Sequence, residues 1–226
     1  MTSLKVAVIG GGALGLMALK NLTEDGFDAT CYEARSYIGG LWRSSNDSSL
    51  SIAQGTTIFN TSRFRGAISD FPFPPEVDDF PTAEQIHAYL ESYCDHFRLR
   101  NRIKLNTRVV GLQRSGMKWI VKAVQNETGS HLNVNYFDKV LVAIGTFTFP
   151  KIPQIEGMDL FGGPHPHAKQ FHDPAQYKSK TVLVIGLHAT GQDVTVALSR
   201  SASKVYISHK RGLVMVCLYM AEIESD

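Results

Sequence analysis

Two segments of the chain share one hydrophobic pattern, an apolar strand followed by a glycine turn and an amphipathic helix. Val6–Ile9 is a short apolar run that leads into the turn Gly10–Gly15, and a helical pattern continues to Gly26. The segment at 28–34 predicts a second strand, which completes a βαβ unit. From Thr181 the order is repeated by the strand "TVLVIG", the helix "TGQDVTVALSRS" and the strand "KVYIS". Both segments therefore predict parallel strands joined by a helix.

The sequence between the two units predicts a loop region, a helix and several strands. Residues 39–81 are irregular, and the prolines of "DFPFPPEVDDFP" argue against central strands there. The stretch "TAEQIHAYLESYCDHFRL" predicts a helix with Thr82 as its N-cap and one buried stripe. The segments "IKLNTRVVGLQR", "KWIVKAVQ" and "HLNVNYFDKVLVAIG" predict a meander, and its last part predicts a buried strand at Val140–Ile144.

The order of these elements predicts an α/β fold with two Rossmann-like dinucleotide-binding βαβ units. The stretch "TFTFPKIPQIEGM" has no regular period and closely spaced prolines, so a domain boundary is expected near Pro150. We expect a first dinucleotide-binding domain at 1–150. The second unit, at 151–226, follows it and has the elements of only the N-terminal part of such a domain.

Composition and charge narrow the class of protein. The 226 residues are 43% hydrophobic and 19% charged, as in ordinary globular proteins. The formal net charge of +2 gives no electrostatic reason to expect nucleic acid as a partner. Three widely spaced cysteines, Cys31, Cys94 and Cys217, favour a reducing compartment and predict neither a disulfide framework nor a metal site. With no signal peptide or membrane segment expected, the sequence favours a cytoplasmic protein.

The first glycine turn has the residues of a phosphate-binding site. Gly10, Gly12 and Gly15 fill the three positions of G-x-G-x-x-G. The first glycine permits the bend, the second lets a pyrophosphate approach the backbone, and the third lets helix and strand pack closely. Glu33 closes the second strand, where a carboxylate can accept hydrogen bonds from ribose hydroxyls. The turn is a candidate site for FAD or NAD, and the alternative is a turn that only connects a strand to a helix.

The second turn predicts a different nucleotide. Gly186 and Gly191 are present, but His188 replaces the middle glycine, where it would crowd a pyrophosphate or donate a hydrogen bond to it. At the interval where the first unit has its acid, the second has "SHKRG". Lys210 and Arg211 would attract a 2′-phosphate, which favours NADP; the alternative is that they are solvated surface charges. Two such turns in one chain predict two dinucleotides, one passing a hydride to the other.

The chain resembles the flavin-containing monooxygenase family over nearly its whole length. "FGGPHPHAKQF" is similar to the identifying sequence F-x-G-x-x-x-H-x-x-x-F/Y, and "EARSYIGGLWR" to E-x-x-x-x-x-G-G-x-W. "VAIGTFTFP" resembles the A-T-G-x-x-x-x-P linker, with Ile144 in place of threonine. "NTSRFRGAISDFPFP" resembles the region in which an asparagine, here Asn60, lies near the reactive edge of the isoalloxazine.

The resemblance implies an enzyme that uses FAD and NADPH. It implies transfer of one oxygen atom of O2 to a nitrogen, sulfur or carbonyl group of a small molecule through a flavin C4a-hydroperoxide. Asn60 is then the candidate catalytic residue, with a turn-capping role as its alternative, and His167 is mainly structural. The predicted cofactor-binding residues are Gly10, Gly12, Ala13, Leu14, Gly15, Glu33, Gly40, Leu41, Trp42, Asn60, Gly186, His188, Thr190, Gly191, Ser208, Lys210 and Arg211.

One other interpretation stays open, and the sequence argues against two more. Family members continue beyond the residues matched here, so the chain could be a non-catalytic remnant that binds nucleotide weakly or an interaction module, and exposed sheet edges could make it self-associate. A disulfide reductase would need a redox cysteine pair, which the cysteine spacing does not supply. A short-chain dehydrogenase would need Tyr-x-x-x-Lys on a helix, whereas Tyr206 and Lys210 match by spacing on an expected strand.

Overall fold

The computed structural model describes residues 3–43, 57–125, 132–147 and 149–210. The chain divides into two compact units, one formed by Met1–Arg43 with Glu84–Thr148 and the other by Ser44–Ala83 with Phe149–Asp226. Arg211 and the C-terminal tail, which include one predicted nucleotide contact and Cys217, lie outside the described residues.

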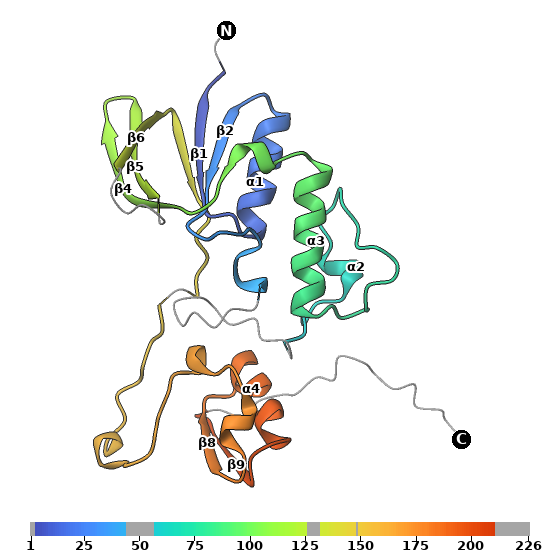
Figure 1. Ribbon diagram of the computed structural model, residues 1–226, viewed down its shortest axis with the longest axis vertical. Coiled ribbons are helices and arrows are strands. Elements are labelled where there is room, and N and C mark those ends of the chain that lie inside the picture. Colours follow the sequence, from blue (N-terminus) through green and yellow to red (C-terminus); the bar gives the residue numbers. More distant parts are fainter. Residues whose placement is uncertain (1–2, 44–56, 126–131, 148, 211–226) are drawn as a thin grey trace. The chain divides into compact units, whose positions relative to one another are not determined.

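The first unit is built on a four-stranded parallel sheet with strand order β3-β2-β1-β7. Helices cover one face of this sheet and an antiparallel three-stranded sheet lies against the other (Figure 1). The strands and main helices are β1 (Lys5–Ile9), α1 (Ala13–Glu24), β2 (Asp28–Tyr32), α3 (Ala83–His96), β3 (Ile103–Lys104), β4 (Thr107–Ser115), β5 (Lys118–Gln125), β6 (Leu132–Phe137) and β7 (Lys139–Val142).

Apolar residues of both sheets form the core between them. Ala7 and Tyr32 from the parallel sheet pack with Val121, Ala123 and Phe137 from the antiparallel sheet, and all five are buried. The Tyr32 and Phe137 rings meet edge to face, with centroids 6.0 Å apart. The antiparallel sheet therefore fixes the parallel strands from the side opposite the helices.

The meander prediction is confirmed for β4, β5 and β6 and is wrong at both flanks. Ile103–Lys104 pairs with β2 in the parallel sheet and does not continue into β4. Asp138 separates β6 from β7, and β7 pairs with β1. The strand expected to be buried at Val140–Ile144 is Lys139–Val142 and lies at the edge of the parallel sheet in the described residues, where Val142 is 56% exposed; Ile144 lies beyond its end and is 61% exposed.

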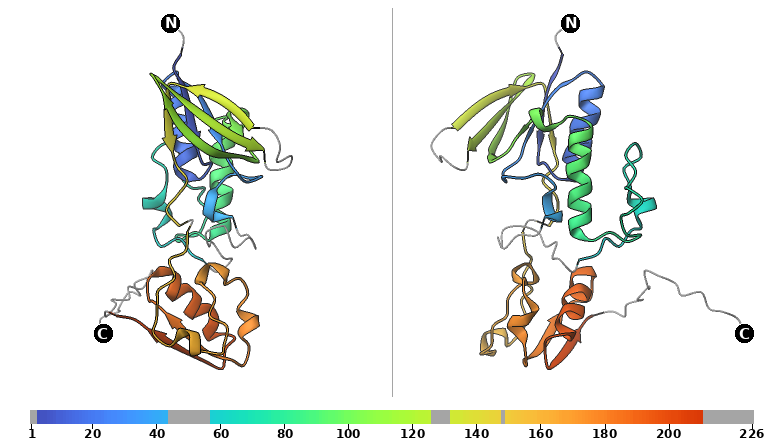
Figure 2. Two further views of the ribbon diagram at one scale, coloured as in Figure 1. Left: turned by 90° about the vertical axis from the view of Figure 1, so that its left-hand side faces the viewer. Right: turned by 45° about the vertical axis from the view of Figure 1, so that its right-hand side comes forward.

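The second unit contains the second βαβ motif. The motif consists of β8 (Thr181–Ile185), α4 (Ala189–Ser199) and β9 (Lys204–Ser208), and β8 pairs with β9 in parallel. The unit also contains the short helix α2 (Arg63–Gly66). Figure 2 shows α4 lying along these two strands. Buried Phe171, Ala197 and Leu198 form its core, with valines of both strands packed against them. The predicted α/β fold with two Rossmann-like units is confirmed.

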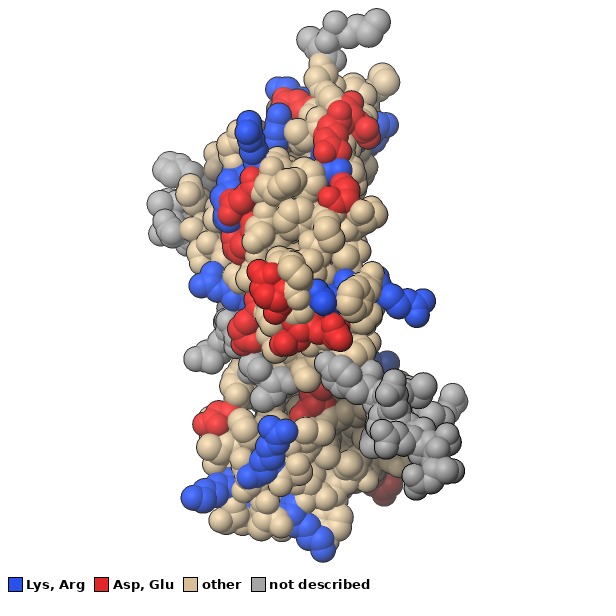
Figure 3. Space-filling view, turned by 90° about the vertical axis from the view of Figure 1, so that its right-hand side faces the viewer, with Lys and Arg blue, Asp and Glu red and all other residues tan. Residues whose placement is uncertain are grey.

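The surface carries charges of both signs. The face shown in Figure 3 carries both lysine or arginine and aspartate or glutamate side chains, in keeping with the small formal net charge of +2. Within the part of the chain that the structure describes, no helix has the length and apolar character needed to cross a membrane.

Candidate functional site: two glycine turns

The first glycine turn is shaped by two close backbone approaches. Gly10 has φ +105°, and its N–H donates to the Tyr32 carbonyl at the end of β2, with N and O 2.9 Å apart. A Cβ on Gly15 would lie 1.8 Å from the Gly10 carbonyl oxygen, so α1 can start beside the turn only with a glycine there. The structure thus places the first and third glycines as the motif predicts.

Gly12 leaves the space that a phosphate would need. It is the N-cap of α1, and no side chain caps the helix, so the N–H groups of its first turn have no acceptor from the cap. The nearest atom to an added Cβ on Gly12 is the Cα of Gly40, at 3.7 Å. Ala13 is half-buried and Leu14 is 71% exposed. The arrangement is an open helix N-terminus between two glycine segments, which fits a dinucleotide pyrophosphate.

Glu33 lies beside this turn, directly after β2, and is buried. Its Oε2 accepts a hydrogen bond from the Gly11 N–H at 2.6 Å, and its Oε1 accepts one from the Arg35 N–H at 2.9 Å. The sequence predicts a carboxylate at this place, whereas its two bonds to backbone N–H groups follow only from the folded structure. Each carboxylate oxygen can accept a second bond, so Glu33 can brace the turn and still receive a ribose hydroxyl.

The segment Gly39–Trp42 completes the first site from the other side. Gly39 has φ +95° and donates from its N–H to the Gly11 carbonyl oxygen at 2.9 Å. Gly40, Leu41 and Trp42 form a single 3-10 turn and are half-buried. Gly12, Glu33 and Gly40 therefore surround one turn, although Gly40 follows Gly12 by many residues in the sequence.

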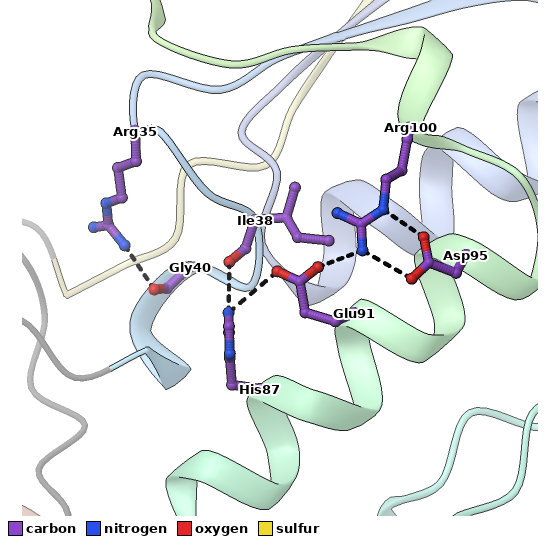
Figure 4. Close-up of polar contacts among 7 residues, drawn as sticks. All are labelled: Arg35, Ile38, Gly40, His87, Glu91, Asp95 and Arg100. Carbon is purple, nitrogen blue, oxygen red and sulfur yellow. Dashed lines mark hydrogen bonds and ion pairs between the residues drawn. The ribbon is translucent and has the colours of Figure 1, made fainter.

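Two residues of this site were not predicted from the sequence, and Figure 4 shows how they lie. Arg35 donates from Nη1 to the Gly40 carbonyl oxygen at 2.6 Å. His87 reaches from α3 to the Ile38 carbonyl oxygen, 3.2 Å from its Nε2. A charged residue shortly after the acid could have suggested Arg35. No local signal marks His87, because the contact joins segments far apart in the chain.

The second turn repeats the geometry of the first. Gly186 has φ +104°, and its N–H donates to the Ser208 carbonyl at the end of β9, with N and O 2.8 Å apart. A Cβ on Gly191 would lie 2.1 Å from the Gly186 carbonyl oxygen. The same two glycine constraints thus recur, with Thr190 exposed in the first turn of α4.

His188 takes the place of Gly12 without changing the backbone. Its φ and ψ of −77° and 179° match those of Gly12, −75° and −177°, and this extended conformation suits any residue. Its side chain is exposed and makes no cap hydrogen bond to α4. The histidine is therefore accommodated by the fold, and its imidazole stands where the first turn has open space.

The end of β9 carries the residues that differ most from the first unit. Ser208 ends the strand as Tyr32 ends β2, so His209 occupies the position that Glu33 has in the first unit. His209 and Lys210 are exposed, and Arg211 lies outside the described residues. A histidine and a lysine thus stand at the equivalent of a buried carboxylate.

The candidate catalytic residue Asn60 belongs to the second unit. It is exposed, in the segment that leads to α2. Arg63 holds this segment by donating to the carbonyl oxygens of Pro74 and Pro75, 3.2 and 3.1 Å away, and by pairing with Asp79 at 3.2 Å. The role of Asn60 next to a flavin stays a prediction.

The histidine of the identifying sequence has a structural position. The His167 Nδ1 accepts a hydrogen bond from the Lys169 N–H at 3.1 Å, and the Gln170 side chain accepts one from the His167 N–H at 3.1 Å. This reciprocal cap starts a 3-10 turn, Ala168–Gln170, that leads into buried Phe171. The motif therefore anchors the segment before β8 to the core of the second unit.

The chemistry of the buried cysteines argues against a disulfide reductase. Cys31 and Cys94 are free thiols inside the first unit. Burial raises the pKa of Cys31 to about 12 and that of Cys94 to about 11, which disfavours the reactive thiolate. Tyr206 lies on strand β9 and not on a helix, so the Tyr-x-x-x-Lys spacing of a short-chain dehydrogenase is accidental.

Comparison with known proteins shows the family. The family model described as flavin-binding monooxygenase-like matches residues 3–221, so the chain belongs to this family, as its motifs predict. Monooxygenase aurF of Gibberella zeae is 37% identical over 213 residues, which cover 93% of this chain and 40% of that protein. The N-oxide-forming dimethylaniline monooxygenase 2 of Oryctolagus cuniculus is 34% identical, over 92% of this chain and 40% of that protein.

A solved structure supports the same assignment. S-allyl-L-cysteine S-oxygenase from Allium sativum aligns with a TM-score of 0.86 and 27% identity, covering 93% of this chain and 53% of that one. The chain spans 40% of the length of the curated relatives named here.

Proposed function

We propose that the chain binds FAD at the first glycine turn and NADPH at the second, as the dinucleotide-binding part of a monooxygenase that acts on a small molecule. One observation carries the proposal. The two units repeat the same glycine geometry, but Glu33 follows the second strand of one and His209 with Lys210 follows that of the other. A carboxylate accepts bonds from ribose hydroxyls, whereas cations attract a 2′-phosphate.

The first site fits FAD through its backbone. The open N-terminus of α1 would receive the pyrophosphate, with Gly12 at the closest approach and Gly40 facing it from the other side. Glu33 would hold the ribose of the adenosine half, and its two bonds to backbone N–H groups keep the carboxylate in place. These residues bind and orient the cofactor; none of them needs to exchange a proton.

The second site fits NADPH through its charges. The N-terminus of α4 would face the pyrophosphate, and the exposed His188 side chain would lie against it as a hydrogen-bond donor. Ser208, His209, Lys210 and Arg211 would surround the 2′-phosphate. Bound FAD would supply the redox chemistry between NADPH and O2, and the protein's part would be to orient both nucleotides and to exclude water.

The proposed substrate is a small molecule with an oxidisable nitrogen, sulfur or carbonyl group. The names of the relatives support the first two, since one forms an N-oxide and another is an S-oxygenase. Asn60 is the proposed catalytic residue, whose amide would hydrogen-bond to the flavin or the nicotinamide, as the family resemblance implies. The exposed position of Asn60 leaves that amide accessible.

A flavin titration tests the proposal on the chain as it exists. The purified protein is titrated with FAD, and the complex is mixed with NADPH or NADH without oxygen while the visible flavin absorption is followed. We expect saturable FAD binding and faster bleaching by NADPH. With O2 and a panel of amines, thioethers and ketones, Asn60→Ala should lower oxygenated product relative to peroxide, while the neighbouring Thr61→Ala serves as the matched control. A folded chain that takes up no FAD would overturn the proposal.

A further inference from the structure

His87 lies on α3, and its ring fills the space that Gly39 leaves. A Cβ on Gly39 would be 2.6 Å from the His87 Cδ2, so the two residues are in direct contact only because position 39 is a glycine. Gly39 also has φ +95°, a conformation that L side chains rarely adopt. The turn at 39–40 is therefore matched to one particular side chain on α3.

The polar contacts of His87 fix the direction in which its ring points. Its Nε2 lies 3.2 Å from the Ile38 carbonyl oxygen and 3.4 Å from the Glu91 Oε1 (Figure 4). A carbonyl oxygen only accepts, so His87 must carry its proton on Nε2 to bond with Ile38. The Ile38 carbonyl oxygen is the nearer of two acceptors that face this N–H, and the carboxylate of Glu91, one helical turn further along α3, is the second.

The carboxylate of Glu91 is itself held by Arg100. Arg100 donates from Nη2 to the Glu91 Oε2 at 2.5 Å and to the Asp95 Oδ2 at 2.9 Å. These residues come from α3 and the turn that follows it, so the series of contacts runs from the end of α3 back to His87 (Figure 4). Of these charged side chains, Glu91 contacts the His87 ring, and Arg100 in turn holds Glu91.

The other side of the 39–40 turn touches the first glycine turn. The Gly39 N–H bonds to the Gly11 carbonyl oxygen, and a Cβ on Gly40 would lie 3.2 Å from the Gly12 Cα. A shift of the 39–40 turn toward Gly12 would close the space left for a phosphate, and a shift away would break the bond to Gly11. The turn is held in place by His87 on one side and by Arg35 on the other.

We infer that His87 is a positioning residue for the first nucleotide site, which sets the distance between the Gly39–Gly40 turn and Gly12 through its bond to Ile38. The inference rests on the proposed binding of FAD at this site. The role proposed for His87 involves no contact with the cofactor or the reacting atoms. The side chain acts through the turn, and Glu91 and Arg100 act through His87.

Two substitutions separate the hydrogen bond from the bulk of the ring. His87→Leu introduces an apolar side chain of similar size that cannot donate a hydrogen bond. The side-chain amide of His87→Gln can still donate one to the Ile38 carbonyl oxygen. We expect FAD affinity to fall about tenfold in His87→Leu and to stay within about threefold of the parent in His87→Gln, as for one lost hydrogen bond. His96→Leu is the matched control on the same helix and should leave FAD affinity unchanged.

Amide hydrogen exchange supplies a second measurement that needs no FAD. In the ligand-free chain, exchange in the peptide that contains residues 38–42 should be faster in His87→Leu than in the parent, and unchanged in His87→Gln and His96→Leu. Equal exchange and affinity in parent and His87→Leu would overturn the inference, as would equal losses in the Leu and Gln variants. If the parent binds no FAD, the proposed function fails, and the exchange pattern still decides whether His87 positions the turn.

Discussion

Gly12 and Gly15 in the first turn differ in how strongly the fold requires a glycine at each position. Gly15 is needed by the fold, because its Cα–H faces the Gly10 carbonyl oxygen with no room for a side chain. Gly12 has an ordinary extended backbone and space around it, so the fold itself does not require a glycine there. The motif therefore combines one glycine that packing requires with another that the fold alone does not require, as the proposed binding role of Gly12 would explain.

The matched pair Gly15→Ala and Gly12→Ala tests this division. We expect Gly15→Ala to lower the free energy of unfolding by about 1–3 kcal/mol or more, because the methyl group must displace backbone. Gly12→Ala should unfold like the parent in urea and bind FAD at least about tenfold more weakly, because the methyl group occupies the place of the pyrophosphate. Loss of stability in Gly12→Ala with FAD affinity intact would contradict the assignment.

At the scale of elements, the proposed choice of nucleotide rests on the end of the second strand in each βαβ unit. Glu33 and His209 occupy equivalent positions, since the N–H of the first glycine bonds to the residue before each of them. Apart from His188 in place of Gly12, the two turns share the same glycine geometry, so under the proposed function a few side chains would set the choice between nucleotides.

Removal of the positive charges after β9 should weaken the preference for NADPH. We expect Lys210→Ala combined with Arg211→Ala to lower NADPH affinity by about tenfold or more while NADH affinity changes little, because each charge-assisted bond contributes about 1.5–3 kcal/mol. Lys204→Ala, at the other end of the same strand, is the control. Nucleotide titrations of the flavin-loaded protein measure both affinities, and equal affinities in the parent would sink the prediction.

Asp138 joins the two sheets of the first unit, and its charge should make stability depend on pH. Its carboxylate accepts bonds from the Lys118 Nζ at 2.5 Å and the Lys5 N–H at 2.8 Å, and these lower the pKa of Asp138. The resulting stability is present above about pH 4, near the ordinary pKa of aspartate, and is lost as the pH falls through the lowered value.

Urea unfolding at a series of pH values measures this effect. The unfolding midpoint of the parent should fall as the pH is lowered below about 4, and the fall should be smaller in Asp138→Asn, which has no carboxylate to protonate. Lys118→Met should also reduce the dependence, because it removes the main cause of the lowered pKa. The same pH dependence in all three proteins would show that Asp138 does not link the sheets energetically.

The sequence predicts elements whose signals are local and misses those set by distant pairing. Both βαβ units follow from apolar runs, glycine spacing and helical periodicity, which act within a few residues. That β3 and β7 join the parallel sheet depends on pairing with β2 and β1 across long stretches of chain. The site divides in the same way: Gly12 and Glu33 were predicted, whereas the contact of His87 with Gly39 exists only once α3 has packed.

At the scale of the whole molecule, the described residues of the second unit cover one face of its small sheet and leave apolar side chains exposed on the other. Val182, Val184 and Val205 pack toward the core with α4, so the alternate residues of β8 and β9 point to the opposite face. Leu183 and Tyr206 are paired across the two strands and are 58% and 49% exposed, and Ile185 is 53% exposed. Adjacent apolar side chains of this kind favour association between molecules.

We therefore expect this chain to self-associate through the exposed face of β8 and β9. Leu183→Glu should shift the protein toward monomer in sedimentation velocity over a dilution series, because burying an unpaired carboxylate opposes the contact. Val196→Glu introduces the same charge at a residue of α4 that is 56% exposed and should leave the distribution unchanged. Because β8 and β9 pack on α4 through their other face, neither variant should change the far-ultraviolet circular dichroism. A parent that sediments as a monomer at every concentration would show that this face stays solvated.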